Sequence, residues 1–218
     1  MIQVKGKSLE VIDLISELPL ATLAELEEPC RWVRLGTNET VFDRDSQDRD
    51  IYFVVRGGVQ IVNYSSAGRE IAYARVLQGG YFGELAAIDG KPRSASVVTV
   101  EASHLAAVSP TVFLDLLSGH WDVTVKILHR FAAIVRYCDD RIMDLSTLRA
   151  EKRICAELLR LAKPDAKNPG GWLIYPMWTQ KEIAGRVGST RETVGRVLVQ
   201  LADLEIVRRQ SKALFVLD

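Results

Sequence analysis

Short apolar runs separated by glycine or polar turns fill the chain from Cys30 to Val108. Clear examples are 51–55, 59–64 and 70–76. Runs of this length at even spacing predict an all-β sandwich or barrel, and a jelly roll fits the pattern. Gly57 and Gly58 stand at one turn and Gly68 at the next. Because glycine accepts the positive φ of a tight turn, we expect antiparallel pairing of the runs on either side.

The pattern changes to a helical one at Ser109-Pro110, a strong helix N-cap and first-turn signal. It predicts a short helix to about Leu117 that ends at Gly119. Before the strands, the leader segment 11–15 predicts another helix packed on the outside of the sandwich.

A long helix is expected from about residue 120 to 148, where neither glycine nor proline occurs. Its apolar residues recur at spacings of three and four. They are Ile127, Phe131, Ile134, Cys138, Ile142, Leu145 and Leu148. The helix could lie on its own sandwich, but a stripe this long outruns a sandwich face. It favours pairing with a second copy in a parallel coiled coil.

Residues 149–218 form a separate helical unit. Ile154, Leu158, Leu159 and Leu161 mark a helix that ends near Lys163-Pro164. Thr179 and Glu182 then form a capping box, and Gly188 makes a turn between two short amphipathic helices, which is typical of a helix-turn-helix. The last segment, 206–217, predicts a hairpin with a basic tip.

Charge divides the chain in the same way. Residues 1–148 carry 15 Lys and Arg against 20 Asp and Glu, whereas residues 149–218 carry 13 against 8. A basic module joined to an acidic one is typical of a nucleic-acid reader joined to a sensor. The three cysteines are widely spaced and form no C-x-x-C pair, so they indicate neither a disulfide framework nor a zinc site. We expect Cys30 and Cys155 to be small buried hydrophobes.

The segment 81–96 combines the residues that a sugar-linked anion needs. Arg93 offers a fixed cation whose planar fork suits a phosphate, and the glycine-flanked backbone offers N–H groups. Glu84 is suited to accept hydrogen bonds from a ribose hydroxyl, and Ser94 adds a hydroxyl. The alternative is a surface turn in which Glu84 and Arg93 only pair with each other.

The second helix of the helix-turn-helix is predicted to read DNA bases in the major groove. Arginine binds guanine through two hydrogen bonds and glutamate accepts from cytosine N4, so Arg191, Glu192 and Arg196 predict a half-site that contains G·C pairs. Lys181, Arg186, Arg208, Arg209 and Lys212 are expected to contact phosphates. The full set of predicted DNA contacts is Thr179, Gln180, Ser189, Arg191, Glu192, Thr193, Arg196 and Lys212. The alternative is an ordinary solvated helix face.

Together, the F-G-E and R-S-A cassette, the long helix and the R-E-T-V-G-R segment at 191–196 resemble the CRP/FNR superfamily over almost the whole chain. The resemblance implies a homodimer in which a cyclic nucleotide, bound against the long helices, reorients two winged-helix domains to bind a palindrome and contact RNA polymerase. In that family an R-E-x-x-x-R helix reads a TGTGA-type half-site. Gly83, Glu84, Leu85, Arg93 and Ser94 match the cassette.

The resemblance breaks at Cys138-Asp139, which stand where cAMP-responsive members have a Thr-Ser pair that meets adenine. These two residues are still predicted to face the ligand. The cassette implies a cyclic nucleotide, with cAMP favoured over cGMP, but the base identity stays open. Asp139 could accept from the N1–H and N2–H2 donors of guanine, or it could simply face solvent.

The sequence therefore predicts an α+β protein: a β jelly roll over residues 1–119, a dimerisation helix over 120–148 and a winged helix-turn-helix over 149–218. We expect a cytoplasmic regulator with no metal, no membrane contact and no enzymatic activity. An enzyme that acts on nucleotides would need a nucleophile, a base or a metal cluster beside the cassette, and the sequence shows none. An iron–sulfur sensor would need an N-terminal cysteine cluster and a haem sensor would need axial ligands, and the sequence indicates neither. The alternative within the same fold is an orphan regulator that binds DNA without nucleotide.

Overall fold

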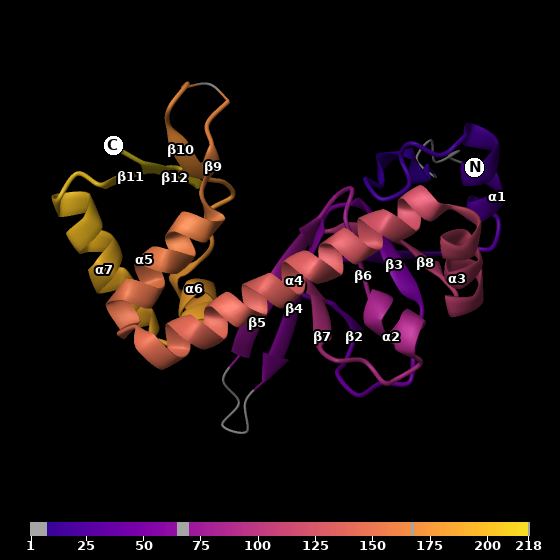
Figure 1. Ribbon diagram of the computed structural model, residues 1–218, viewed down its shortest axis with the longest axis horizontal. Coiled ribbons are helices and arrows are strands. Elements are labelled where there is room, and N and C mark those ends of the chain that lie inside the picture. Colours follow the sequence, from indigo (N-terminus) through magenta and orange to yellow (C-terminus); the bar gives the residue numbers. More distant parts are fainter. Residues whose placement is uncertain (1–7, 65–69, 167, 218) are drawn as a thin grey trace. The chain divides into compact units, whose positions relative to one another are not determined.

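The computed structural model describes residues 8–64, 70–166 and 168–217, in which the chain forms two compact units (Figure 1). The first unit comprises Met1–Asn63 and Tyr73–Ala133, and the second comprises Tyr64–Ala72 and Ile134–Asp218. Each unit has its own hydrophobic core.

Two four-stranded sheets build the first unit. One has the order β1-β8-β3-β6 and the other β2-β7-β4-β5. Their bounds are β1 Arg31–Leu35, β2 Thr40–Phe42, β3 Ile51–Arg56, β4 Gly58–Tyr64, β5 Glu70–Leu77, β6 Tyr81–Phe82, β7 Ser96–Thr99 and β8 Ser103–Val108. The antiparallel register sets Tyr52 opposite Ala107 and Gln60 opposite Val98. The predicted jelly-roll class is confirmed.

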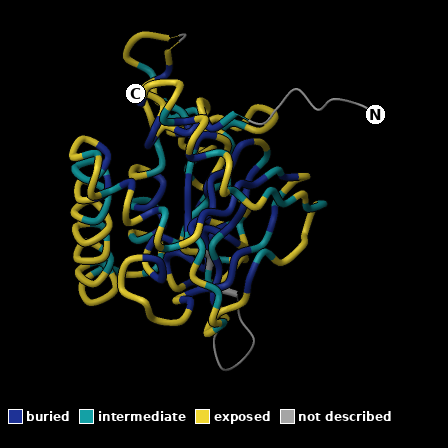
Figure 2. The backbone as a smooth tube through the Cα atoms, turned by 90° about the vertical axis from the view of Figure 1, so that its right-hand side faces the viewer, coloured by how far each residue is buried: buried dark blue, intermediate teal, exposed yellow. Residues whose placement is uncertain are grey.

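Aromatic and branched side chains fill the space behind these strands. Phe53, Phe82 and Leu105 are fully buried, and the rings of Tyr52 and Phe82 stack with centroids 5.2 Å apart. Figure 2 shows the buried residues concentrated in the strands and the exposed ones on turns and outer helix faces. Burial of this apolar surface is the main stabilising contribution to the unit.

The turn at Gly57 differs from the sequence prediction. β3 and β4 do not pair with each other: β3 pairs with β8 and β6, whereas β4 pairs with β7. Gly57 has a φ of 86°, as expected, but Gly58 is not among the glycines with positive φ. The turn carries the chain from one sheet to the other. The sequence did not reveal this, because strands buried on both faces have no hydrophobic alternation that could assign their partners. Gly68 lies outside the described residues.

The leader prediction was also wrong. Leu9–Val11 forms a 3-10 turn capped by Ser8, and the α-helix of this region is α1, Leu20–Glu27. Residues Ile12 and Ile15 are fully buried, so the leader packs in the core and not as an outer helix.

Helices complete the first unit and continue from it. α2 spans Glu84–Asp89, and α3 spans Pro110–Gly119, where the Ser109 side chain accepts from the Val112 amide as predicted. α4 runs from Trp121 to Thr147. Ile127 is buried in the core of the first unit, so it does not belong to a free apolar stripe.

The second unit places three helices against a small sheet of order β11-β12-β10-β9. Its elements after α4 are α5 Ala150–Leu161, β9 Lys163–Pro164, β10 Trp172–Ile174, α6 Gln180–Val187, α7 Arg191–Asp203, β11 Val207–Gln210 and β12 Ala213–Val216. Ile154, Ile183 and Val194 lie at 0% exposure in its core, whereas Leu159 of the predicted helix is exposed. The predicted helix-turn-helix and basic-tipped hairpin are confirmed.

Cys30 and Cys155 are half-buried against the two cores and Cys138 is exposed; all three are free thiols. Burial, with a smaller effect of Glu27, raises the pKa of Cys30 to about 12. Among the described residues, none of the helices combines the length and the apolar character that a membrane crossing needs.

Candidate nucleotide site and nucleic-acid interface

The cassette is a short helix held between two glycines. Gly83 precedes α2 with a φ of 88° and Gly90 follows it with a φ of 68°, both in the left-handed region. Gly90 donates its amide to the Ala86 carbonyl, which closes the helix. The sequence suggested only a glycine-flanked loop, because a six-residue helix leaves too little periodicity to detect.

Arg93 is the most constrained side chain of the cassette. It is 2% exposed, and its Nη1 donates to the Gly83 carbonyl at 3.0 Å. Its Nη2 donates to the Asp50 carbonyl at 2.6 Å and to Asp48 Oδ2 at 2.8 Å. The guanidinium carbon lies 3.9 Å from the centre of the Phe42 ring. The cation is therefore held by carbonyl oxygens, one carboxylate and an aromatic face.

One nitrogen of Arg93 has no acceptor. Nε is buried and finds no hydrogen-bond acceptor among the described residues. A buried N–H without a partner costs about 1–3 kcal/mol, so native structures rarely keep one without a reason. A phosphate oxygen is the kind of acceptor that would satisfy it.

Asp48 is the fixed counter-ion of Arg93. Burial alone would raise the pKa of Asp48, but hydrogen bonds from Arg93, the Asp50 amide and the Tyr52 hydroxyl outweigh it, so the pKa lies below its usual value. The carboxylate is therefore ionised at neutral pH. Sequence reasoning missed Asp48, because it is one of several acidic residues in an exposed polar segment and nothing marks its partner.

Glu84 is buried at the start of α2, and a cation from another element faces it. Arg130 of α4 places Nη2 3.7 Å from Glu84 Oε1, and its guanidinium carbon lies 4.0 Å from the centre of the Tyr81 ring. Both partners belong to the first unit. The predicted alternative, a direct pair between Glu84 and Arg93, is not what the structure shows. Arg130 was missed because the helix that carries it has several similar charges.

The remaining predicted ligand contacts are exposed. Leu85 and Ser94 lie on the surface of the first unit. Cys138 and Asp139 are exposed on α4 and belong to the second unit, whereas the cassette belongs to the first. Their predicted contact with the ligand therefore stays a prediction.

The helix-turn-helix is fixed by local hydrogen bonds at both of its helices. The Thr179 hydroxyl accepts from the Glu182 amide while Glu182 Oε2 accepts from the Thr179 amide at 2.6 Å, which completes the predicted capping box. Gly188 ends α6 with a φ of 61°, and Thr190 caps α7 by accepting from the Thr193 amide. These caps set where α6 and α7 begin through residues that are close in the sequence.

The predicted base-reading residues lie on the outside of α7. Arg191, Glu192 and Arg196 are all exposed. A hydrogen bond from its own amide, together with the Thr190 hydroxyl, holds the pKa of Glu192 below its usual value, so the side chain is an ionised acceptor. The remaining predicted contacts divide by exposure: Thr179 and Lys212 are exposed, Gln180 and Thr193 are half-buried and Ser189 is buried.

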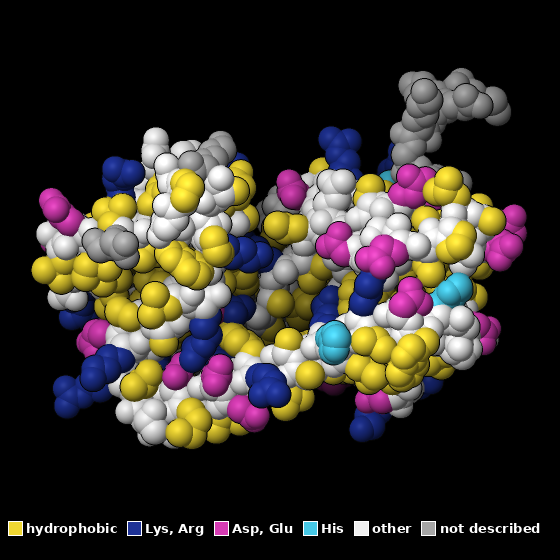
Figure 3. All heavy atoms as spheres, turned by 45° about the horizontal axis from the view of Figure 1, so that its top comes forward, with side chains coloured by type: hydrophobic (Ala, Val, Ile, Leu, Met, Phe, Trp, Pro, Cys, Tyr) yellow, Lys and Arg dark blue, Asp and Glu magenta, His cyan; other side chains and the backbone are white. Residues whose placement is uncertain are grey.

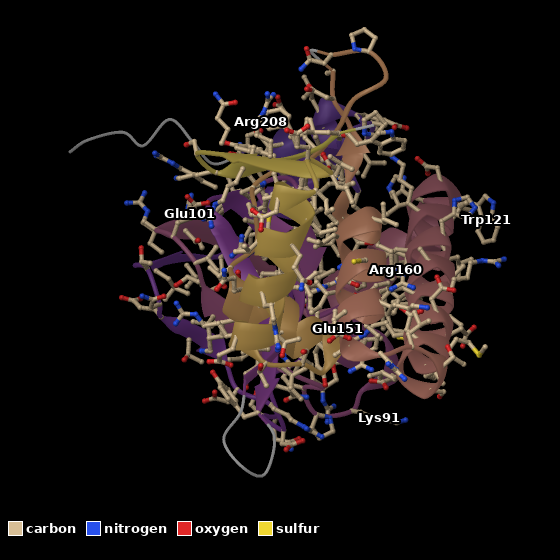
Figure 4. All side chains as sticks on the ribbon, turned by 90° about the vertical axis from the view of Figure 1, so that its left-hand side faces the viewer. Lys91, Glu101, Trp121, Glu151, Arg160 and Arg208 are labelled. Atoms are coloured by element: carbon tan, nitrogen blue, oxygen red, sulfur yellow. The ribbon has the colours of Figure 1, made fainter. Side chains whose placement is uncertain are left out.

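One predicted phosphate contact is wrong. Arg186 is 7% exposed and forms an ion pair with Glu157 inside the unit, so it cannot reach a DNA backbone. Lys181, Arg208, Arg209 and Lys212 are exposed. Figure 4 labels Arg208 at the edge of the terminal strands, pointing outward.

Comparison with known proteins gives the same division. Residues 32–120 match the family described as cyclic nucleotide-binding domain, and residues 152–218 match the Crp-like helix-turn-helix domain. The cAMP-activated global transcriptional regulator CRP of Salmonella typhimurium is 30% identical over 190 residues, which are 86% of this chain and 90% of that protein. The chain belongs to the CRP family of transcription regulators. Members of this family are DNA-binding proteins and not enzymes.

Solved structures of CRP-family regulators share the fold. The catabolite activator protein of Thermus thermophilus is 26% identical, with a TM-score of 0.56 over 94% of this chain and 93% of that one. The regulator CLP of Xanthomonas campestris is 22% identical, with a TM-score of 0.68 over 92% of this chain and 100% of that one, a likeness of fold alone.

We predict that Gly83→Ala lowers both the stability of the nucleotide-binding domain and its ligand affinity, whereas Gly90→Ala lowers stability by a smaller amount. Both glycines have positive φ, so both variants bear the strain of a left-handed alanine. A Cβ at position 83 would lie 2.7 Å from Arg93 Nη1 and 2.9 Å from the Asp50 carbonyl, whereas one at position 90 meets nothing within 4 Å.

The difference between the two variants therefore isolates the crowding of Arg93, which we expect to cost about 1–3 kcal/mol. Urea denaturation of the two variants measures it. Equal free energies of unfolding would show that the Gly83–Arg93 contact is not tight.

Proposed function

We propose that this CRP-family protein is a cyclic-nucleotide-responsive transcription regulator that binds palindromic promoter DNA as a homodimer. In this proposal residues 1–119 bind the nucleotide, 120–148 dimerise and 149–218 bind DNA, and the protein works in the cytoplasm, where it would meet RNA polymerase.

The observation that carries the nucleotide assignment is the free Nε–H of the buried Arg93, which belongs to the same cassette as the buried Glu84. A cyclic phosphate would supply the missing acceptor, and its ribose hydroxyl would donate to Glu84. The 3.7 Å separation between Glu84 and Arg130 is longer than a close charged hydrogen bond, so it leaves Glu84 able to accept from a sugar.

The relatives favour cAMP as the effector. The curated relative of Salmonella typhimurium carries "cAMP-activated" in its name. Cys138 and Asp139 lack the paired hydroxyls expected for adenine, so cGMP is the second candidate. CLP is described as a c-di-GMP-responsive regulator, which makes that dinucleotide a useful comparison ligand.

An orphan regulator that needs no nucleotide is the competing function. Two observations favour it: Asp48 already neutralises Arg93, and Arg130 already faces Glu84. A nucleotide would have to bind to a cation that has a partner, at a cost in affinity. Direct titration separates the two functions.

The DNA assignment depends on side chains that the fold leaves free. Arg191 and Arg196 can each donate two hydrogen bonds to guanine, and the ionised Glu192 can accept from cytosine N4. The exposed cations of the β11–β12 hairpin, Arg208, Arg209 and Lys212, would contact phosphates. Such contacts set the position of the protein along the DNA without reading its sequence.

The dimer assignment depends on one face of α4. Trp121, Leu128, Val135 and Ile142 recur every seven residues and are 51–72% exposed. Cys138 and Leu145 occupy the complementary heptad positions and are also exposed. Figure 3 shows hydrophobic side chains exposed among charged ones on this face of the molecule, and Figure 4 shows Trp121 pointing away from its helix. A strict seven-residue repeat fits pairing with a second copy of the same helix. This exposed stripe contains Leu128, whereas the stripe predicted from the sequence contained Ile127, which is buried.

We predict that calorimetric titration detects binding of cAMP or cGMP to the nucleotide-free protein, and that Arg93→Lys weakens it at least about 10-fold. Lysine keeps the charge but loses the Nε–H and the planar fork, and a hydrogen bond to a charged group contributes about 1.5–3 kcal/mol. Arg44→Lys, an exposed change in the same unit, serves as the matched control. Absence of binding by cAMP, cGMP and c-di-GMP in the wild type would establish the orphan function instead.

For DNA, we predict that binding-site selection recovers a palindrome whose half-sites lie about one helical turn apart. Arg196→Ala should cost about 1–3 kcal/mol and relax the preference at one base pair, whereas Lys212→Ala should weaken all sequences alike. If Arg196→Ala lost affinity uniformly, Arg196 would contact phosphate and not a base.

For the dimer, we predict that Val135→Asp combined with Ile142→Asp converts the protein to a monomer in sedimentation experiments. Charges placed in the seam of a coiled coil lose their hydration without gaining a partner. Met143→Asp is the matched control, because Met143 is equally exposed but lies off the seven-residue stripe. A stable dimer in the double variant would place the interface elsewhere.

A further inference from the structure

A buried polar cluster joins α4, α5 and α6 inside the second unit. Glu157 of α5 is 1% exposed, and its carboxylate pairs with Arg186 Nε of α6. The Tyr137 hydroxyl of α4 donates to Glu157 at 3.3 Å and accepts from Arg186 Nη2. Burial raises the pKa of Tyr137, so the hydroxyl keeps the proton that it donates.

A second layer of arginines surrounds this cluster. Arg160 of α5 pairs with Asp144 of α4 at 2.6 Å, and Figure 4 labels Arg160 on its helix. Arg141 of α4 donates to the Arg186 carbonyl at the end of α6. Arg153 of α5 donates to the carbonyls of Val187 at 2.8 Å and Gly188 at 3.2 Å. Two cations thus cover the negative C-terminal end of α6, where helix carbonyls have no partners of their own.

The corner between α4 and α5 is bridged by the same residues. Arg153 Nη1 also donates to the Leu148 carbonyl at 2.8 Å, directly at the corner. The Arg160–Asp144 pair spans the corner further out. Bending at residues 146–150, between the end of α4 and the start of α5, would break both contacts and expose the ion pair of Glu157.

We propose that Tyr137, Glu157 and Arg186 are positioning residues that fasten the last turns of α4 to the helix-turn-helix, so that the flexing point lies before Tyr137. The proposal rests on the proposed function, because Tyr137 adjoins Cys138 and Asp139, where the nucleotide base is predicted to meet α4. When α4 bends at that point, its last turns move together with α6 and α7, because the corner between α4 and α5 stays fixed.

The boundary between the compact units supports this placement. Within α4 the boundary falls between Ala133 and Ile134, and the helix continues through it. Tyr137, Arg141 and Asp144 recur at spacings of three and four, so one face of the helix presents all three to α5 and α6. A cluster that only stabilised the winged helix would not need contributions from α4.

Hydrogen exchange measured by mass spectrometry on the full chain tests the flexing point directly. We expect the amides of 138–150 to exchange together with those of α5, and Tyr137→Phe to raise the exchange rate of 138–150 about 10-fold or more. Tyr175→Phe removes a hydroxyl from an exposed tyrosine of the same unit and should change nothing. Faster exchange of 146–150 than of 130–137 in the wild type would overturn the proposal.

A second measurement tests the positioning role. The dissociation constant of cAMP, or of cGMP if that binds, is determined with and without the selected operator. The coupling ratio is the dissociation constant without DNA divided by the one with DNA. We expect Tyr137→Phe to lower this ratio about 10-fold, or to one if the wild-type ratio is smaller than that, and to leave the constant without DNA unchanged. An unchanged ratio would overturn the role. A ratio of one in the wild type would refute the proposed function, and the exchange experiment would still decide where the chain flexes.

Discussion

The buried guanidinium of Arg93 is the interaction on which the nucleotide-binding domain depends. Placing a cation at 2% exposure is costly unless its charge and its donors are matched. Asp48 supplies the charge, and the carbonyls of Gly83 and Asp50 supply the acceptors. These partners come from two distant segments, so the ion pair holds the cassette against the segment before β3. It also fixes the direction of the Nε–H, which has no acceptor among the described residues.

The second unit solves a similar problem in the same way. Arg186 is buried, its charge is matched by Glu157, and carbonyls at the end of α6 are covered by other arginines. In both units a buried arginine ties together segments that are far apart in sequence. The residues of α7 that are proposed to read bases follow a helix start that is set locally, by the caps at Thr179 and Thr190.

Sequence reasoning succeeded where the signal is local. Ser109 and Thr179 were identified as caps, Gly188 as the turn and the jelly roll from its evenly spaced strands, because each of these depends on residues within a few positions of each other. It failed where the partner is distant. Nothing near Arg186 shows that it faces Glu157, and nothing near β3 shows that it pairs with β8 and not with β4. Asp48 and Arg130 escaped notice for the same reason.

In the proposed function, Arg93 directs its Nε–H toward the place of a phosphate oxygen. Nuclear magnetic resonance of protein labelled with 15N at arginine Nε observes that proton directly. On addition of saturating cAMP or cGMP, we expect the Arg93 resonance to move downfield and its exchange with water to slow, while that of Arg44 stays in place. An Arg93 resonance that does not change with either nucleotide would show that this proton does not meet a phosphate oxygen.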